Sequence, residues 1–216
     1  MALPQLKLLP VEQYLGVNNN DPIRFYKYPI FGTMYRRRVE MCLAECKGGQ
    51  RMLEVGFGSG VTFLNLNENY KEIHGLDLTA SVEKVHAVFA PLKIETYLKN
   101  GSVLDMPYED NYFDSVLLIS ILEHLQKADQ IKAFTEIRRV LKPGGQVVYG
   151  VPIERPFMVF MFRMLGYNIR EHHFSTEKDV SSSAAQVLKK VSVQQMSSVP
   201  SFFGKVYEVG HFVKAV

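Results

Sequence analysis

The chain has 216 residues, of which 47% are apolar and 22% are charged, and its formal net charge at pH 7 is +3. This length suffices for one domain with a buried core, and the composition is that of a soluble globular protein. So small a net charge disfavours a dedicated nucleic-acid-binding protein, which carries a clustered basic face. No apolar run approaches the roughly 20 residues that cross a bilayer. No charged leader precedes an apolar stretch either, so we expect a cytoplasmic protein without a membrane span.

Two regions are expected along the chain. Residues 1–46 should form an N-terminal extension or lid, and residues 47–216 a single domain. The extension is irregular and contains several prolines up to residue 32, and apolar residues at helical spacing then predict a helix over residues 33–46. Gly48 and Gly49 should end this helix.

Short apolar runs alternate with helical patterns from residue 51 onward, which is typical of a parallel sheet covered by helices. Helices are expected after the first strand up to about Tyr70, and then over residues 79–90 and 127–141. The segment Lys142-Pro143-Gly144-Gly145 should form the turn that closes the last of these helices. The first five strands are expected over residues 51–55, 73–78, 94–99, 113–120 and 146–151.

The end of the chain has a different pattern. A helix over residues 177–190 is followed by two strand-like segments, residues 191–199 and 205–214. Their connection is too short for a parallel crossover, so the two should pair antiparallel. The predicted fold is α/β: a doubly wound, mostly parallel seven-stranded sheet with an antiparallel C-terminal strand and helices on both faces.

A glycine-rich loop follows the first strand. An acid, Glu54, precedes the sequence Gly56-Phe57-Gly58-Ser59-Gly60. Glycines at a strand-to-helix junction permit a tight turn and a close approach of the backbone to a ligand. A dinucleotide fingerprint would need a third glycine where the chain has Val61. The alternative is a plain strand-to-helix turn without a ligand.

Further segments follow this loop in a characteristic order. They are Gly75-Leu76-Asp77, Asn100-Gly101-Ser102-Val103, Phe113-Asp114, Leu122-Glu123-His124 and Lys142-Pro143-Gly144-Gly145. In this order and spacing, over about residues 50–152, the glycine-rich loop and these segments resemble the class I S-adenosylmethionine-dependent methyltransferases, in the subgroup that acts on small molecules.

The resemblance implies S-adenosylmethionine as cofactor, with S-adenosylhomocysteine as product. Glu54 would hold the ammonium group, and Asp77 would accept both ribose hydroxyls. Asp77 could instead cap the next helix, although Thr79 could also serve as that cap. Ser102 stands where the family often has an adenine-binding acid. The cofactor-binding residues implied are Glu54, Gly56, Phe57, Gly58, Gly60, Asp77, Leu78, Ser102, Val103 and Ser120.

Methyl transfer from a sulfonium is an in-line displacement, so the enzyme chiefly aligns the donor and the acceptor. His124 is the candidate general base, and a histidine hydrogen-bonded to backbone is the structural alternative. The variable regions 1–46 and 153–176 are rich in aromatic residues and methionine, which predicts a small apolar or amphipathic acceptor. Within the first region, Arg36-Arg37-Arg38 forms a solvated helix face or contacts an acidic group.

Metal ligands are not expected. Cys42 and Cys46 should lie one helical turn apart, a poor geometry for a disulfide, and the chain has only these two cysteines to offer an iron–sulfur cluster. Glu171, His172 and His173 suggest a metal site, but adjacent histidines on a strand point in opposite directions. We expect a surface loop there.

Three other functions fit parts of the pattern. A nicotinamide-dependent oxidoreductase shares the architecture and the ribose-binding acid, but not the glycine spacing. A non-catalytic module could bind S-adenosylmethionine and act through a partner, in keeping with Ser102 and the absence of a clear base. A methyltransferase acting on RNA or protein would place its specificity in the N-terminal region, although the weak net charge disfavours RNA.

Overall fold

The computed structural model describes residues 3–16, 22–153, 174–197 and 204–216. The predicted aromatic and methionine segment after the fifth strand, with His172 and His173, lies outside the described residues. Within the described ranges, no helix combines the length and the apolar character needed to cross a membrane.

A seven-stranded sheet forms the centre of the molecule, in the order β3-β2-β1-β4-β5-β7-β6. The first five strands pair parallel with their neighbours, and β7 pairs antiparallel with both β5 and β6. The predicted fold is therefore confirmed. The strands are β1 (Gly49–Val55), β2 (Tyr70–Asp77), β3 (Thr96–Asn100), β4 (Phe113–Ile119), β5 (Leu141–Pro152), β6 (Lys189–Ser197) and β7 (Lys205–Val213).

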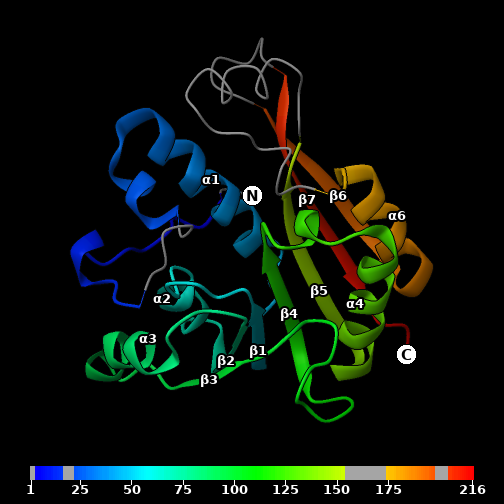
Figure 1. Ribbon diagram of the computed structural model, residues 1–216, viewed down its shortest axis with the longest axis horizontal. Coiled ribbons are helices and arrows are strands. Elements are labelled where there is room, and N and C mark those ends of the chain that lie inside the picture. Colours follow the sequence, from blue (N-terminus) through cyan, green and yellow to red (C-terminus); the bar gives the residue numbers. More distant parts are fainter. Residues whose placement is uncertain (1–2, 17–21, 154–173, 198–203) are drawn as a thin grey trace.

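Helices cover both faces of this sheet (Figure 1). The buried side chains of α1, α2 and α3 share one apolar cluster, and those of α4 and α6 share the other. These helices are α1 (Pro29–Glu45), α2 (Phe63–Leu66), α3 (Val82–Phe89), α4 (Lys127–Val140) and α6 (Glu177–Val187), and the short 3-10 helices are η1 (Val11–Gln13), η2 (Pro22–Lys27), η3 (Ala90–Leu92) and η4 (Leu122–His124).

The apolar stripe of α4 illustrates how the sequence pattern becomes packing. Phe134, Ile137 and Val140 are spaced three residues apart and lie on one helix face, and all three are fully buried against the sheet. Burial of each such side chain contributes roughly 1.5–3 kcal/mol. Thr176 and Asp179 form a capping box that fixes the start of α6 over the same face.

Helix α1 starts earlier than predicted. It begins at Pro29, because proline suits the first helical turn, where its missing N–H would have no partner. Val39 and Cys42 of this helix share an apolar cluster with Met52 of β1. The N-terminal region thus packs on the sheet, and its separation from residues 47–216 stays a prediction.

Two predicted elements are wrong. The helix expected up to Tyr70 is only the four-residue α2, because turns occupy the residues before it and β2 already begins at Tyr70. The turn expected at residues 142–145 lies inside β5. There the register shifts between the pairs Phe113–Leu141 and Ser115–Gln146, so the glycines form an irregularity within the strand.

Candidate cofactor site

The carboxyl ends of β1, β2 and β4 meet at one edge of the sheet, where the rule for open α/β sheets places ligands. The glycine-rich loop after β1 is fastened to the end of β2 there. The Gly56 N–H donates to the Leu76 carbonyl over 2.7 Å, and the Gly58 N–H donates to the Asp77 carboxylate over 3.0 Å. Phe57 is buried and its ring packs 6.1 Å from that of Phe63.

Glycine is required at two positions of this loop. Gly56 and Gly60 both have φ of +73°, in the left-handed region that residues with a Cβ rarely adopt. A Cβ on Gly56 would lie 2.1 Å from the Ile121 Cδ1, so the side chain after β4 rests directly on the loop. A Cβ on Gly60 would lie 2.8 Å from the rings of Phe63 and Phe89.

Glu54 is a buried acid, only 3% exposed, at the end of β1. The pKa of its carboxyl is raised to about 8: burial raises it most, the hydrogen bond from the Thr62 hydroxyl lowers it, and the nearby Asp77 raises it. Among the described residues no cation pairs with this carboxyl. A ligand that brings an ammonium group would supply the missing charge, so the residue fits the cofactor that the resemblance implies.

Asp77 holds the loops after β1 and β2 together. One carboxylate oxygen accepts from Gly58, and the other accepts from the N–H groups of Thr79 at 2.8 Å and Ala80 at 2.9 Å. The N-terminal cap position of α3 belongs to Ser81, so the suggestions that Asp77 or Thr79 caps this helix are wrong. The carboxylate is fixed in place at the edge of the sheet.

The third predicted cofactor-binding segment contains Ser102 and Val103, and both side chains already contact the protein itself. The Ser102 hydroxyl accepts from the Leu104 N–H over 3.1 Å, and the Val103 side chain is buried in the apolar cluster beneath the sheet. Leu78, in contrast, is 73% exposed immediately beyond Asp77. Of these three residues, Leu78 therefore offers a side-chain surface to a ligand, and Ser102 offers a hydroxyl that is already hydrogen-bonded.

A partly buried group of polar side chains lies where β4 ends. Ser120 has φ of +58°, and its hydroxyl lies 3.1 Å from the Tyr207 hydroxyl of β7. Arg38 of α1 donates to Ser120 over 3.4 Å, with its guanidinium 4.0 Å from the ring centre of Tyr35 and 5.8 Å from that of Tyr207. The sequence predicted that Arg36, Arg37 and Arg38 either form a solvated helix face or contact an acidic group. Arg37 is exposed as on a solvated face, and Arg38 is not.

His124 is exposed at the end of η4, a few residues beyond β4. The buried Gln130 of α4 anchors this turn, because its amide donates to the carbonyls of Leu122 and Leu125 over 3.0 and 3.4 Å. The Ser183 hydroxyl of α6 donates to the same amide's oxygen. In the described part of the chain, no cluster of histidine, cysteine or acidic residues could hold a metal ion.

Three contacts at this edge were not predicted from the sequence. They are the hydrogen bond from Thr62 to Glu54, the packing of Ile121 on Gly56, and the group formed by Arg38, Ser120 and Tyr207. The spacing of Tyr35 and Arg38, three residues apart on one helix, was the available signal for the last of these.

Residues 53–149 match the family described as a methyltransferase domain. Over these residues the chain is similar to a methyltransferase domain. It is 37% identical over 144 residues to a demethylmenaquinone methyltransferase of Staphylococcus aureus, which covers 60% of the chain and 52% of that protein. It is 28% identical over 131 residues to a ubiquinone biosynthesis O-methyltransferase of Alkalilimnicola ehrlichii, covering 57% of the chain and 51% of that protein.

The fold is shared with solved structures. The N-methyltransferase NodS from Bradyrhizobium japonicum, in complex with S-adenosylhomocysteine, superposes with a TM-score of 0.65 at 17% identity, covering 94% of this chain and 96% of that one. The resemblance to class I S-adenosylmethionine-dependent methyltransferases is confirmed. The chain spans about half the length of the two curated relatives, so the activity of the whole protein is a proposal.

Proposed function

We propose that the protein transfers the methyl group of S-adenosylmethionine to a small apolar or amphipathic acceptor. The observation that carries this proposal is the pair Glu54 and Asp77 beside the glycine-rich loop. Glu54 is a buried acid that no cation of the described residues pairs with, and Asp77 is a fixed carboxylate at the end of the next strand. The two relatives named above, both methyltransferases by name, support the reaction class.

Each residue has a role in this proposal. Glu54 binds the ammonium group of the cofactor, Asp77 accepts from its ribose hydroxyls, and the loop from Gly56 to Gly60 lies beneath its amino-acid part. Leu78 and the Ser102 hydroxyl border the adenine, and Val103, whose side chain is buried, offers it only a backbone N–H. When bound, the cofactor supplies an activated methyl group for in-line displacement.

The acceptor side of the site lies beyond β4. Ser120 sits at the end of this strand, and Ile121 covers the loop at Gly56, so both border the space between the cofactor and the acceptor. His124 is the proposed general base for an acceptor that must lose a proton. Its exposed position just after β4 supports access to the acceptor.

Calorimetric titration with S-adenosylmethionine, S-adenosylhomocysteine and NAD tests the cofactor assignment. The wild-type protein should bind both sulfur nucleosides saturably and should not bind NAD. Asp77→Asn should weaken binding of S-adenosylhomocysteine by about tenfold or more, because an amide accepts fewer hydrogen bonds and carries no charge. Asp105→Asn is the matched control, since Asp105 is an exposed acid in the neighbouring segment.

Two results would contradict the proposal. Binding of NAD in place of the sulfur nucleosides would favour the oxidoreductase. Tight binding of S-adenosylhomocysteine without methyl transfer to any of a broad panel of acceptors would favour the non-catalytic module. The engaged Ser102 hydroxyl, with no acid at its position, is the observation that keeps this second function in view.

A further inference from the structure

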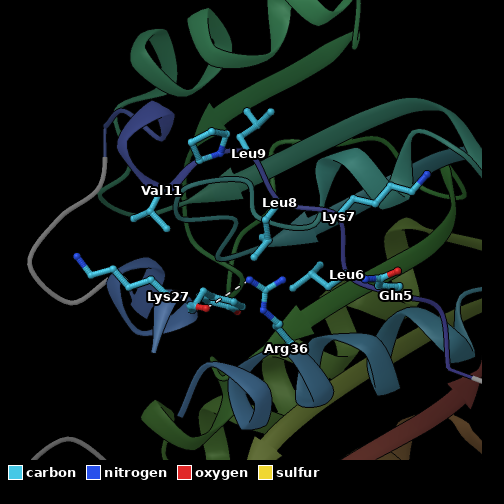
Figure 2. Close-up of a pocket in the computed structure, with 10 residues that line it drawn as sticks. Gln5, Leu6, Lys7, Leu8, Leu9, Val11, Lys27 and Arg36 are labelled. Carbon is cyan, nitrogen blue, oxygen red and sulfur yellow. Dashed lines mark hydrogen bonds between the residues drawn. The ribbon is translucent and has the colours of Figure 1, made fainter. Parts of the chain in front are cut away.

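A cavity of about 630 Å³ lies between the N-terminal segment, residues 5–11, and the first helices of the chain. Tyr26 and Lys27 of η2 and Arg36 of α1 complete its lining. Figure 2 shows Arg36 projecting from α1 toward Leu6 and Leu8, while the Lys27 side chain extends away from Arg36. The site thus combines an apolar surface with three cationic side chains, of which Lys7 forms an ion pair with Glu68 and Lys27 and Arg36 remain.

The charges of this cavity are not balanced by its own lining. None of its lining residues is acidic, and neither Arg36 nor Lys27 forms an ion pair within the described ranges. Glu40 lies one helical turn after Arg36, where it could pair with it, but its carboxylate accepts from the Leu6 N–H over 2.9 Å. Arg36 instead donates to the Tyr26 carbonyl over a long 3.4 Å. The half-buried Arg36 guanidinium therefore has further N–H donors available beside leucine side chains. Such surroundings suit a ligand that carries an anionic group on an apolar chain.

The cavity is connected to the edge of the sheet through aromatic side chains. The Tyr26 ring lies 5.8 Å from the Tyr35 ring, in an edge-to-face arrangement. Arg38 lies over that same Tyr35 ring and donates to Ser120 at the end of β4. A molecule in the cavity is therefore separated from the methyl-transfer site by this row of side chains. Methyl transfer requires reacting atoms about 3 Å apart, so the cavity is a ligand site distinct from that of the methyl acceptor.

We propose that an amphipathic carboxylic acid binds in this cavity as a second ligand of the protein. Its apolar part lies against Leu6, Leu8 and Val11, and its carboxylate pairs with Arg36, with Lys27 adding a second positive charge. This inference goes beyond the proposed methyl-transfer function, because the cavity shares no residue with the proposed cofactor site. Arg36 is the residue that determines specificity for the acid.

The test uses decanoate as an anionic probe and decanol as its neutral counterpart. Each is titrated calorimetrically into the full chain in the presence of saturating S-adenosylhomocysteine. We expect saturable binding of decanoate that is at least tenfold tighter than binding of decanol. Arg36→Met, which keeps the apolar length but removes the charge, should weaken decanoate binding by about tenfold and leave decanol binding unchanged. Arg36→Lys should retain part of the preference.

Arg37→Met is the matched control, because Arg37 is the exposed neighbour on the same helix and does not line the cavity. It should bind decanoate as the wild type does. Leu8→Asp provides a second variant, in which the added carboxylate should repel decanoate by more than it weakens decanol. Leu8 is partly exposed, so this change is compatible with folding.

The inference is overturned if decanoate fails to bind while S-adenosylhomocysteine binds normally. It is also overturned if Arg36→Met and Arg37→Met reduce the affinity for decanoate equally. Failure of S-adenosylhomocysteine itself to bind would contradict the proposed function. The same titrations therefore separate the two conclusions.

Discussion

The buried acid Glu54 makes a prediction about pH that follows from its surroundings. Burial holds the pKa of this carboxyl at about 8, so in the cofactor-free protein it is mostly protonated at pH 7. Binding of the cofactor's ammonium group should lower this pKa, because an opposite charge at close range favours the ionised form. The carboxyl must then lose its proton, so binding should strengthen as the pH rises.

The size of the effect follows from the two ionisation constants. With a pKa of about 8 in the free protein and about 4.5 in the complex, close to an ordinary glutamate, the affinity should rise about 25-fold from pH 5.5 to pH 7. The cofactor's own amino group keeps its proton across this range, since α-amino groups titrate near 8. At pH 7, each binding event should release about 0.9 proton.

Calorimetry measures both quantities. Titrations with S-adenosylhomocysteine at several pH values give the affinity, and titrations at pH 7 in PIPES and in Tris, which differ in their enthalpy of ionisation, give the number of protons released. Glu54→Gln is the control, because the amide has a similar shape and does not titrate. This variant should bind more weakly at pH 7, with little dependence on pH.

A flat pH profile for the wild type, with no proton released at pH 7, would refute the reasoning about Glu54. So would a Glu54→Gln variant that keeps the full dependence on pH. In that case the titrating group would lie elsewhere, and the ammonium group of the cofactor would have another partner.

Two further predictions concern the backbone around the site. Gly56→Ala should weaken S-adenosylhomocysteine binding at least tenfold, because the new Cβ would clash with the Ile121 Cδ1 and alanine disfavours the positive φ of this position. Adding Ile121→Ala to this variant should restore binding only in part. It removes the clash, but the positive φ still costs about 1 kcal/mol. Full restoration in calorimetry would show that the clash alone matters. Gln130→Leu should lower the free energy of unfolding by about 2–4 kcal/mol, because it removes the Gln130 hydrogen bonds with the Ser183 hydroxyl and the Leu122 carbonyl. The Leu122 carbonyl keeps the 3.2 Å bond from the Leu125 N–H and the 3.4 Å bond from Ser175. Thermal unfolding should show a Tm lower by roughly 5–15 °C, and an unchanged Tm would contradict this account.

The centre of the sheet could be predicted because β4 and β5 each contain a short, continuous apolar run. The buried run of β4 and the stripe of α4 are both local patterns that burial on the sheet produces directly. The error at α2 has a local cause as well. Apolar residues from Val61 to Leu66 have helical spacing, but the glycine loop uses the preceding residues for turns, and β2 begins soon afterwards.

The candidate site was predicted only where its residues follow one another in the chain. Glu54 and the glycines are neighbours in sequence, and Asp77 ends the next strand, so motif spacing was informative. Ile121 contacts Gly56 across 65 positions, and Arg38 contacts Ser120 across 82. Such contacts depend on how α1 and the loop after β4 are placed over the sheet, which local patterns do not encode.

The position of β7 has a consequence for the order in which the molecule assembles. This strand follows β6 in the sequence, yet in the sheet it lies between β5 and β6 and is hydrogen-bonded to both. Until β7 has been synthesised and inserted, β5 exposes an open edge and β6 has no neighbour in the sheet. An open strand edge is a template for pairing with other chains. The folding intermediate that lacks β7 is therefore the species most exposed to aggregation, and insertion of this one strand ends that exposure.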